Sequence, residues 1–207
     1  MQKIDQTVID QSMTYTTHRE IIDALYVEGR TTNEENGESM LHYTKMNVSR
    51  MNRLDRKTVL LTEVEDFLQS ISKPQIWLVL TEGWCGDAAQ ILPVMNKMAE
   101  SSPMIELRVI FRDQHLDVMD AFLTNGARSI PKLLVLDSLT KEVSMSWGPR
   151  PSEAQQLMLD AKDKVKTIED QAEQKEYWNE VKTNLQRWYN KDKTQKTQLE
   201  IVDALKN

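Results

Sequence analysis

The sequence predicts an α/β fold in which helices flank a mixed β-sheet, and three observations predict it. Apolar runs at 76–80, 105–111 and 133–136 have the length and residue types of buried strands. Segments of helical period lie between these runs. A short turn at 137–141 joins the third run to a fourth at 142–147, which is typical of a hairpin. The order β-α-β-α-β-β therefore predicts crossover helices and one hairpin in a single sheet.

Further elements are expected before the first of these strands. The spacing of apolar residues predicts helices over 14–28 and 38–54, joined by a polar connector at 31–37. A short strand is expected at 58–61. A capping-box pattern that begins at Thr62 predicts a helix up to about residue 71.

The remaining helices are expected after the first strand and at the C-terminal end. One should follow Cys85, another should lie near 116–123, and the chain from Pro151 onward is expected to be helical. These elements suggest an N-terminal helical extension, a central α/β domain and a C-terminal helical extension packed on the same domain, over residues 1–55, 56–168 and 169–207 respectively.

Composition narrows the class of protein. The chain has 207 residues, of which 40% are hydrophobic, and a net charge of −6, so it is expected to be globular and not disordered or collagen-like. An acidic surface repels phosphate backbones, so no nucleic acid partner is expected. No apolar run approaches the roughly 18 residues that span a bilayer, and the N-terminus lacks the pattern of a signal peptide. We therefore expect no membrane association and a cytoplasmic location.

Cys85 is the only cysteine, so the chain cannot form an internal disulfide. His18, His42 and His115 lie far apart in the sequence, and none has a neighbour at metal-ligand or catalytic spacing. Structural or surface roles are therefore expected for these histidines. No metal and no other cofactor is expected.

The position of Cys85 makes it the one candidate reactive group. It follows a predicted buried strand and precedes a helix, and it is expected to be exposed at the helix N-terminus. The free N–H groups at that end of a helix stabilise a thiolate, whereas the Asp87 carboxylate two residues away disfavours it. These opposed effects leave the protonation state of the thiol open.

Two segments carry a resemblance to a known family. Trp84-Cys85-Gly86 resembles the first half of the thioredoxin motif Trp-Cys-Gly-Pro-Cys, and Pro93 is similar to the proline that kinks the active-site helix of thioredoxins. Residues 126–136 resemble the segment Gly-x-Arg-x-Ile-Pro-x-Leu-Leu, in which the proline follows a cis peptide bond and lies against the reactive cysteine. Here that proline is Pro131, 46 residues after Cys85. The chain thus resembles the thioredoxin family over about 58–165, and the pattern Trp-Cys-Gly-Asp-Ala is similar to a bacterial subgroup of it.

The sequence departs from the family at two positions that matter for chemistry. Ala88 occupies the place of the second, resolving cysteine, and Val79 aligns with the buried acid that serves it. In a dithiol cycle the second thiol releases the mixed disulfide formed by the first. Without it, release needs an external thiol, so the usual dithiol reaction is not expected.

The resemblance also implies a substrate groove beside the thiol. Its lining is expected to consist of Trp84, Gly86, Asp87, Ile130, Pro131, Trp147 and Gly148. Arg150, in the following Pro-Arg-Pro turn, is a candidate contact for an anionic group. The aromatic residues of the C-terminal segment are expected to dock its helices onto the domain; these are Tyr177, Trp178, Trp188 and Tyr189.

Two functions are compatible with these residues. The first is a monothiol redox protein, a thiol-disulfide oxidoreductase in which Cys85 forms a mixed disulfide with a protein or a low-molecular-weight thiol. The alternative is a non-catalytic thioredoxin-fold binding or scaffold module, in which the groove holds a ligand and the thiol is incidental. The extra helices at both ends offer surface for a partner or for a homodimer.

Overall fold

The computed structural model describes residues 2–32 and 37–207, with the backbone alone at Ser39. Of the polar connector predicted at 31–37, residues 33–36 lie outside the described residues. Along the described chain the elements are α1 (Gln6–Gln11), α2 (Tyr15–Val27), α3 (Gly37–Lys57), α4 (Thr62–Gln69), β1 (Gln75–Thr81), α5 (Ala88–Glu100), β2 (Ile105–Phe111), the 3₁₀ turn η2 (Arg112–Gln114), α6 (Leu116–Asp120), β3 (Lys132–Asp137), β4 (Val143–Trp147), α7 (Ser152–Val165), α8 (Gln171–Asp192) and α9 (Gln195–Lys206).

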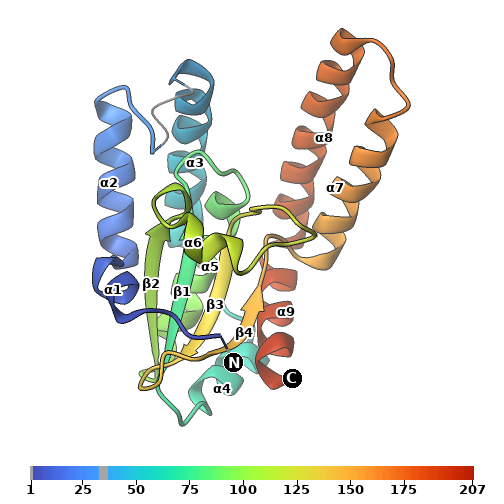
Figure 1. The fold of residues 1–207 in the computed structure, drawn as a ribbon. Coiled ribbons are helices and arrows are strands. Elements are labelled where there is room, and N and C mark those ends of the chain that lie inside the picture. The colour runs from blue at the N-terminus through green and yellow to red at the C-terminus, as the bar shows by residue number, and fades with distance from the viewer. Residues whose placement is uncertain (1, 33–36) are drawn as a thin grey trace.

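The four strands form one mixed sheet in the order β2-β1-β3-β4 (Figure 1). Strand β1 pairs in parallel with β2 and antiparallel with β3, and β3 pairs antiparallel with β4 as the predicted hairpin. The crossover between the two parallel strands is α5. The predicted fold class is confirmed, and Cys85 lies in the loop between β1 and α5.

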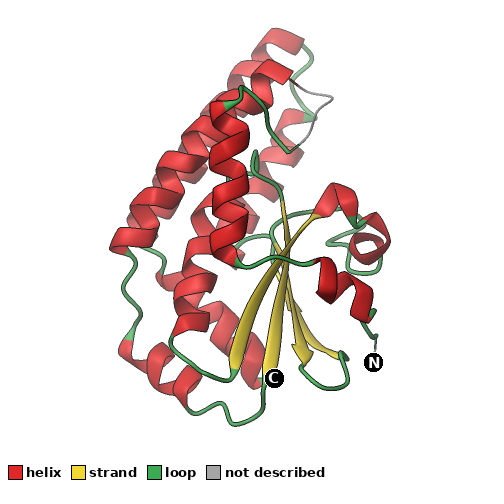
Figure 2. Cartoon of the chain, turned by 90° about the vertical axis from the view of Figure 1, so that its left-hand side faces the viewer, coloured by secondary structure: helices red, strands yellow, loops and turns green. Residues whose placement is uncertain are grey.

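Both faces of the sheet are buried, as the continuous apolar runs require (Figure 2). Alternate residues of β1 serve the two faces. Trp77 and Val79 belong to a core shared with α4, α5 and α9, whereas Leu78 and Leu80 belong to a core shared with α1 and α6. Cys85 packs in the second of these cores, which places the thiol among apolar side chains.

The strand predicted at 58–61 is wrong. This segment has no assigned strand, and its backbone bonds to a side chain and not to another strand. The buried Gln198 of α9 accepts a hydrogen bond from the Leu61 N–H at 2.8 Å and donates one to the Val59 carbonyl at 3.1 Å. The amide of Gln198 therefore meets the hydrogen-bonding needs that a neighbouring strand would otherwise meet.

The C-terminal helices reach two different parts of the molecule. Ile201 and Val202 of α9 lie in the core that covers one face of the sheet. Helices α7 and α8 pack on each other and extend past the end of the sheet (Figure 1). The division of the chain at 55/56 and 168/169 stays a prediction.

Candidate functional site: the Cys85 loop and its cleft

The Cys85 thiol is buried, which corrects the expectation that it is exposed. The residue retains 7% of its accessible surface. Its Sγ donates a hydrogen bond to the Ile130 carbonyl at 3.4 Å and accepts one from the Ala88 N–H at 3.5 Å. The Ile130–Pro131 peptide bond is cis, as the resemblance implied, and the loop that contains it covers the sulfur. A cysteine at the start of a helix is accessible only if the facing loop leaves it open.

Burial decides the protonation state that the sequence left open. Removal from water and the Asp87 carboxylate raise the pKa of the Cys85 thiol to about 12. The N–H groups of Ala88 and Asp87 and the Arg150 guanidinium act in the opposite direction, and they are outweighed. Cys85 is therefore a protonated thiol at neutral pH in this structure.

Asp87 joins three parts of the chain. Its Oδ2 pairs with Nη2 of Arg150 at 2.6 Å, and its Oδ1 accepts a hydrogen bond from the Tyr189 hydroxyl of α8 at 2.9 Å. All three side chains are largely buried. Although Asp87 occupies the N-cap position of α5, its side chain makes no capping hydrogen bond. The carboxylate instead holds the Arg150 turn and α8 against the Cys85 loop.

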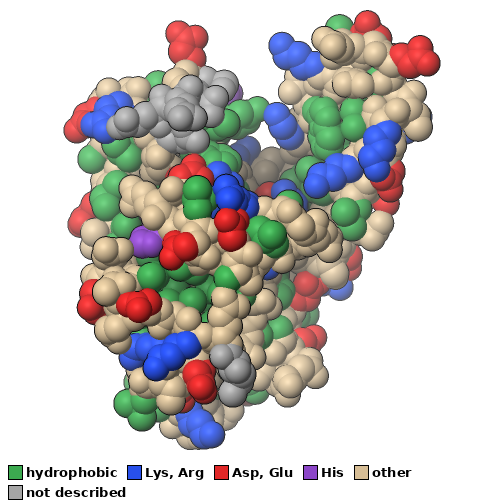
Figure 3. Space-filling model, in the orientation of Figure 1, with side chains coloured by type: hydrophobic (Ala, Val, Ile, Leu, Met, Phe, Trp, Pro, Cys, Tyr) green, Lys and Arg blue, Asp and Glu red, His purple; other side chains and the backbone are tan. Residues whose placement is uncertain are grey.

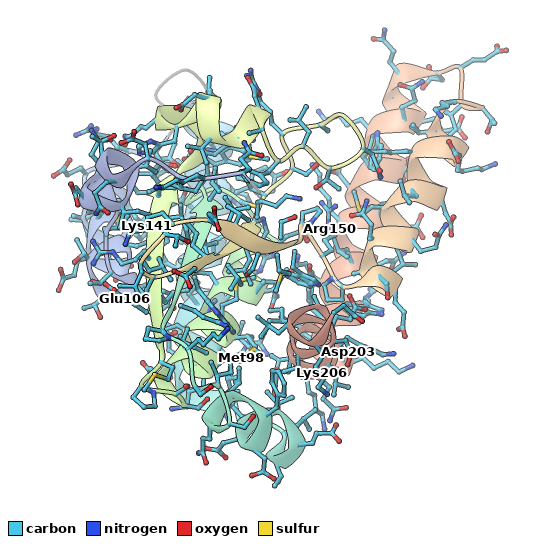
Figure 4. All side chains as sticks on the ribbon, turned by 60° about the horizontal axis from the view of Figure 1, so that its bottom comes forward. Met98, Glu106, Lys141, Arg150, Asp203 and Lys206 are labelled. Atoms are coloured by element: carbon cyan, nitrogen blue, oxygen red, sulfur yellow. The ribbon has the colours of Figure 1, made fainter. Side chains whose placement is uncertain are left out.

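Arg150 was expected to contact an external anion, and its anionic partner in the structure is internal. Figure 4 shows Arg150 between the end of β4 and the α7–α8 pair. Besides Asp87, it donates from Nη1 to the Gln155 side chain at 3.0 Å. Its charge is thus compensated within the chain, and it fixes the position of Asp87.

The predicted groove residues divide into two groups. Trp84, Gly86, Asp87 and Ile130 lie with Cys85 and Arg150 on a cleft of about 800 Å³. In the described part of the chain, three predicted residues do not line it: Pro131, Trp147 and Gly148. Trp147 is part of the core, and Gly148 has φ +118 with an added Cβ only 2.3 Å from the Pro131 carbonyl oxygen. Gly148 therefore lies directly against the backbone of Pro131.

The walls of this cleft come from helices outside the predicted groove. Helix α3 forms one wall, α8 with Met158 of α7 forms the other, and the loops after β2 and before β3 close a third side. Figure 3 shows the surface hollowed between the α3 side and the α7–α8 side, with Lys and Arg side chains around the hollow. The additional described lining residues are Met40, His42, Tyr43, Met46, Arg50, Arg112, Arg128, Ser129, Asn179, Lys182, Thr183, Leu185, Gln186, Arg187 and Asn190.

Both walls reach the loop that carries the thiol. A Cβ on Gly86 would lie 3.5 Å from Arg50 Nη1 of α3 and 3.7 Å from Gln186 Nε2 of α8. Gln186 also accepts a hydrogen bond from Gln90 of α5 at 2.7 Å. Farther out, Lys182 donates to the Tyr43 hydroxyl at 2.9 Å, which joins the two walls directly.

These wall residues could not be predicted from the sequence, for a physical reason. Lys182, Gln186 and Asn190 recur every four residues and so share one face of α8. A polar face of mixed charge is usually solvated, and nothing local distinguishes one that borders a cleft. The aromatic residues were predicted to dock the helices. Trp188 and Tyr189 pack on the core, whereas Tyr177 and Trp178 contact each other on α8.

The histidines do not form a site in the described structure. His18 is buried beside Phe111, and burial lowers its pKa to about 3, so it is neutral. His42 lies on the cleft wall. Among residues 2–32 and 37–207, no three His, Cys, Asp or Glu side chains are grouped so that they could hold a metal ion. None of the described helices is both long enough and apolar enough to cross a membrane.

A four-stranded mixed sheet with a cysteine between β1 and α5, opposite a cis-proline loop, defines a thioredoxin-like protein. The thioredoxin family profile matches residues 33–169, and the chain belongs to this family.

Two solved structures share the fold. A crystal structure of a protein of unknown function from Pseudomonas aeruginosa aligns with a TM-score of 0.54 and 18% identity, over 94% of this chain and 98% of that one. An HIV epitope scaffold aligns with a TM-score of 0.52 and 17% identity, over the same shares of the two chains. No curated protein matches the sequence. At these identities the likeness shows the fold alone.

Proposed function

We propose that this protein is a non-catalytic thioredoxin-fold binding module, in which the cleft above Cys85 holds a ligand and the thiol is part of its floor. The observation that carries the proposal is the state of the thiol. It is buried among apolar side chains, and this burial together with the Asp87 carboxylate raises its pKa to about 12. A nucleophilic thiol acts as the thiolate, and only about one part in 10⁵ would be thiolate at pH 7 with such a pKa.

The positions that serve a second thiol in the family support the same proposal. Ala88 is buried in the core beside Cys85, and Val79 is fully buried in the core on the other face. Both are apolar and well packed, so neither gives the site a proton acceptor or a second sulfur. The cleft, in contrast, has the volume of a site for a small organic ligand.

The test is the pH dependence of Cys85 alkylation by iodoacetamide between pH 6 and 10, with Cys85→Ser as the blank. Steric protection lowers the rate at every pH, whereas thiolate formation sets the midpoint, so the two effects separate. We expect no midpoint below pH 10 in the folded protein, and one near 8.5 after unfolding in urea. A midpoint at or below 8.5 in the folded protein would overturn the proposal.

A second candidate function is monothiol redox chemistry, and the position of the sulfur favours it. Cys85 lies on the cleft and contacts the Ile130 carbonyl next to Pro131, where the resemblance implies that a substrate backbone pairs. In this scheme the Cys85 thiol loses its proton to solvent and its sulfur attacks a substrate disulfide, releasing one thiolate and leaving a mixed disulfide. A first external thiolate, from a protein or a low-molecular-weight thiol, then attacks the Cys85 sulfur of that bond and releases the second substrate thiolate. A second external thiolate attacks the new mixed disulfide, which restores Cys85 and leaves the two external thiols joined as a disulfide.

Glutathione-dependent reduction of a small disulfide distinguishes the two functions. If the protein is a binding module, the wild type and Cys85→Ser should reduce the disulfide at the same rate. If it has the redox function, the wild type should reduce the disulfide faster, and this activity should be lost in Cys85→Ser. The subgroup marked by Trp84–Ala88, the cytoplasmic location and homodimer formation through the terminal helices remain parts of the proposal to be tested.

A further inference from the structure

Three cations on the cleft walls have neutral partners in the described structure. Arg50 of α3 donates from Nη1 to the Asn47 side-chain oxygen at 2.8 Å. On α8, Lys182 donates to the Tyr43 hydroxyl at 2.9 Å, and Arg187 donates to the Asn184 side-chain oxygen at 3.0 Å. Within residues 2–32 and 37–207, none of these three cations forms an ion pair with a carboxylate.

The other cations on the cleft differ in this respect. Arg150 pairs with Asp87, Arg112 with Asp113 at 2.7 Å, and Arg128 with Asp120 at 2.6 Å. Asp87 is the one acidic residue among the described lining residues, and Arg150 already compensates it. The surplus positive charge of the cleft therefore resides on Arg50, Lys182 and Arg187.

This surplus is unusual for the molecule. The chain carries a net charge of −6, yet this cleft is lined, among the described residues, by six cationic side chains and one acidic one. Arg50 is half-buried, and its burial lowers its pKa, the Asp87 carboxylate raises it and the neighbouring Arg53 lowers it. Since Asp87 is already paired with Arg150, Arg50 has lost hydration without an ion-paired carboxylate as its own counter-charge. An anion that entered the cleft would supply that counter-charge.

Apolar side chains line the cleft together with the cations. Met46 of α3, Met158 of α7 and Leu185 of α8 line the same cleft, with Trp84 at its floor. An inorganic ion would leave this surface without a partner. A ligand with an organic body between its charged groups would cover it and bury apolar area.

We propose that the cleft binds a small organic molecule that carries at least two oxyanion groups, with one group held by Arg50 over Gly86 and the other by Lys182 and Arg187 of α8. The inference rests on the proposed binding function and adds the class of ligand. Carboxylates and phosphates share the chemistry that a guanidinium recognises, so either group satisfies the site. The two facing walls are the reason for requiring more than one charge.

The experiment is isothermal titration calorimetry of the full chain with four probes: isophthalate, 1,3-phenylene bisphosphate, benzoate and inorganic phosphate. Isophthalate or 1,3-phenylene bisphosphate should bind, and benzoate and inorganic phosphate, each with a single oxyanion group, should bind about tenfold more weakly or not at all. The aromatic dicarboxylate and the phosphate ester separate the two anion chemistries. If neither of these two compounds produces a heat of binding, the inference is overturned.

Variants connect binding to the named cations. Arg50→Gln should weaken binding about tenfold, Arg50→Lys should keep most of it, and Lys45→Gln, which removes an exposed charge from α3 outside the cleft, should change it little. Lys182→Gln with Arg187→Gln provides the same test on the other wall. Equal affinity in Arg50→Gln and Lys45→Gln would contradict the inference.

Cys85→Ser separates this inference from the function on which it rests. Binding of the dianion in both the wild type and Cys85→Ser supports both. Binding that is lost in Cys85→Ser would keep the ligand class and overturn the incidental role of the thiol. Absent binding together with an inert thiol would overturn the ligand class alone.

Discussion

Tyr189 of α8 donates a hydrogen bond of 2.9 Å to Asp87, a residue 102 positions earlier at the start of α5. The contact joins the C-terminal helix pair to the loop that carries the thiol. Because Asp87 also pairs with Arg150, one buried carboxylate holds three chain segments together. The shape of the cleft therefore depends on the C-terminal helices as much as on the central sheet.

Removal of the Tyr189 hydroxyl should weaken this junction. Tyr189→Phe leaves a buried carboxylate with one partner fewer, which should lower the free energy of unfolding by about 1–3 kcal/mol. Urea denaturation followed by tryptophan fluorescence gives the value. The matched control is Tyr177→Phe, on the same helix and outside the core clusters. Equal stability of the two variants would show that the hydroxyl contributes nothing to the junction.

The charge of Asp87 should control the reactivity of Cys85. The carboxylate raises the pKa of the thiol and Arg150 lowers it, so Asp87→Asn should lower that pKa and Arg150→Gln should raise it. We expect alkylation at pH 8 to become about tenfold faster in Asp87→Asn, in which Arg150 remains. Asp160→Asn, on the exposed face of α7, is the control. A slower rate in Asp87→Asn would reverse the assigned sign.

Gly148 should tolerate no side chain. Its φ of +118 and the Pro131 carbonyl oxygen, 2.3 Å from an added Cβ, both oppose a substitution. Gly148→Ala should therefore cost about 2–4 kcal/mol of stability, since backbone strain and a displaced loop combine. Gly126→Ala is the comparison, because Gly126 also has a positive φ but has open space around an added Cβ. It should cost only about 1 kcal/mol. The difference between the two urea midpoints measures the close approach to Pro131.

Glu82 should make stability depend on pH near neutrality. Burial raises the pKa of this carboxyl to about 7 from 4.5, although Thr32 and the Asp113 N–H donate hydrogen bonds to it. A folded-state pKa above the unfolded one means that the folded protein binds the proton more tightly. This contribution to stability is fully present below pH 4.5 and is lost as the pH rises through 7.

The prediction is tested by the difference in the free energy of unfolding between the wild type and Glu82→Gln. The free energy of unfolding of the variant minus that of the wild type should rise by on the order of 2–3 kcal/mol from pH 5 to pH 8, because the amide of the variant never ionises. The difference is needed because His18, whose pKa is lowered to about 3, makes both proteins lose stability as the pH falls below 6.5. Glu63→Gln, which removes an exposed carboxylate, is the control for the loss of one negative charge. A constant difference across this range would contradict the prediction.

Local patterns were enough for much of the fold. Continuous apolar runs predict strands buried on both faces, and the short turn before β4 predicts a hairpin, because both depend on residues close together in the chain. The segment 58–61 shows where such reasoning fails. It has the composition of a strand, but its partner is the side chain of Gln198, which lies about 140 residues further along.

The sheet, the loop that carries Cys85 and the missing second thiol could be predicted from residue identity and from patterns between residues close in the chain. The cis-proline loop opposite Cys85 could be predicted only from the resemblance to thioredoxins. The burial of the thiol and its raised pKa, in contrast, depend on the tertiary structure, because the Ile130 loop must pack over the sulfur. The tertiary structure also decided that Arg50 and Lys182 face one cleft, because side chains so distant in sequence become neighbours only when α3 and α8 pack around the same loop.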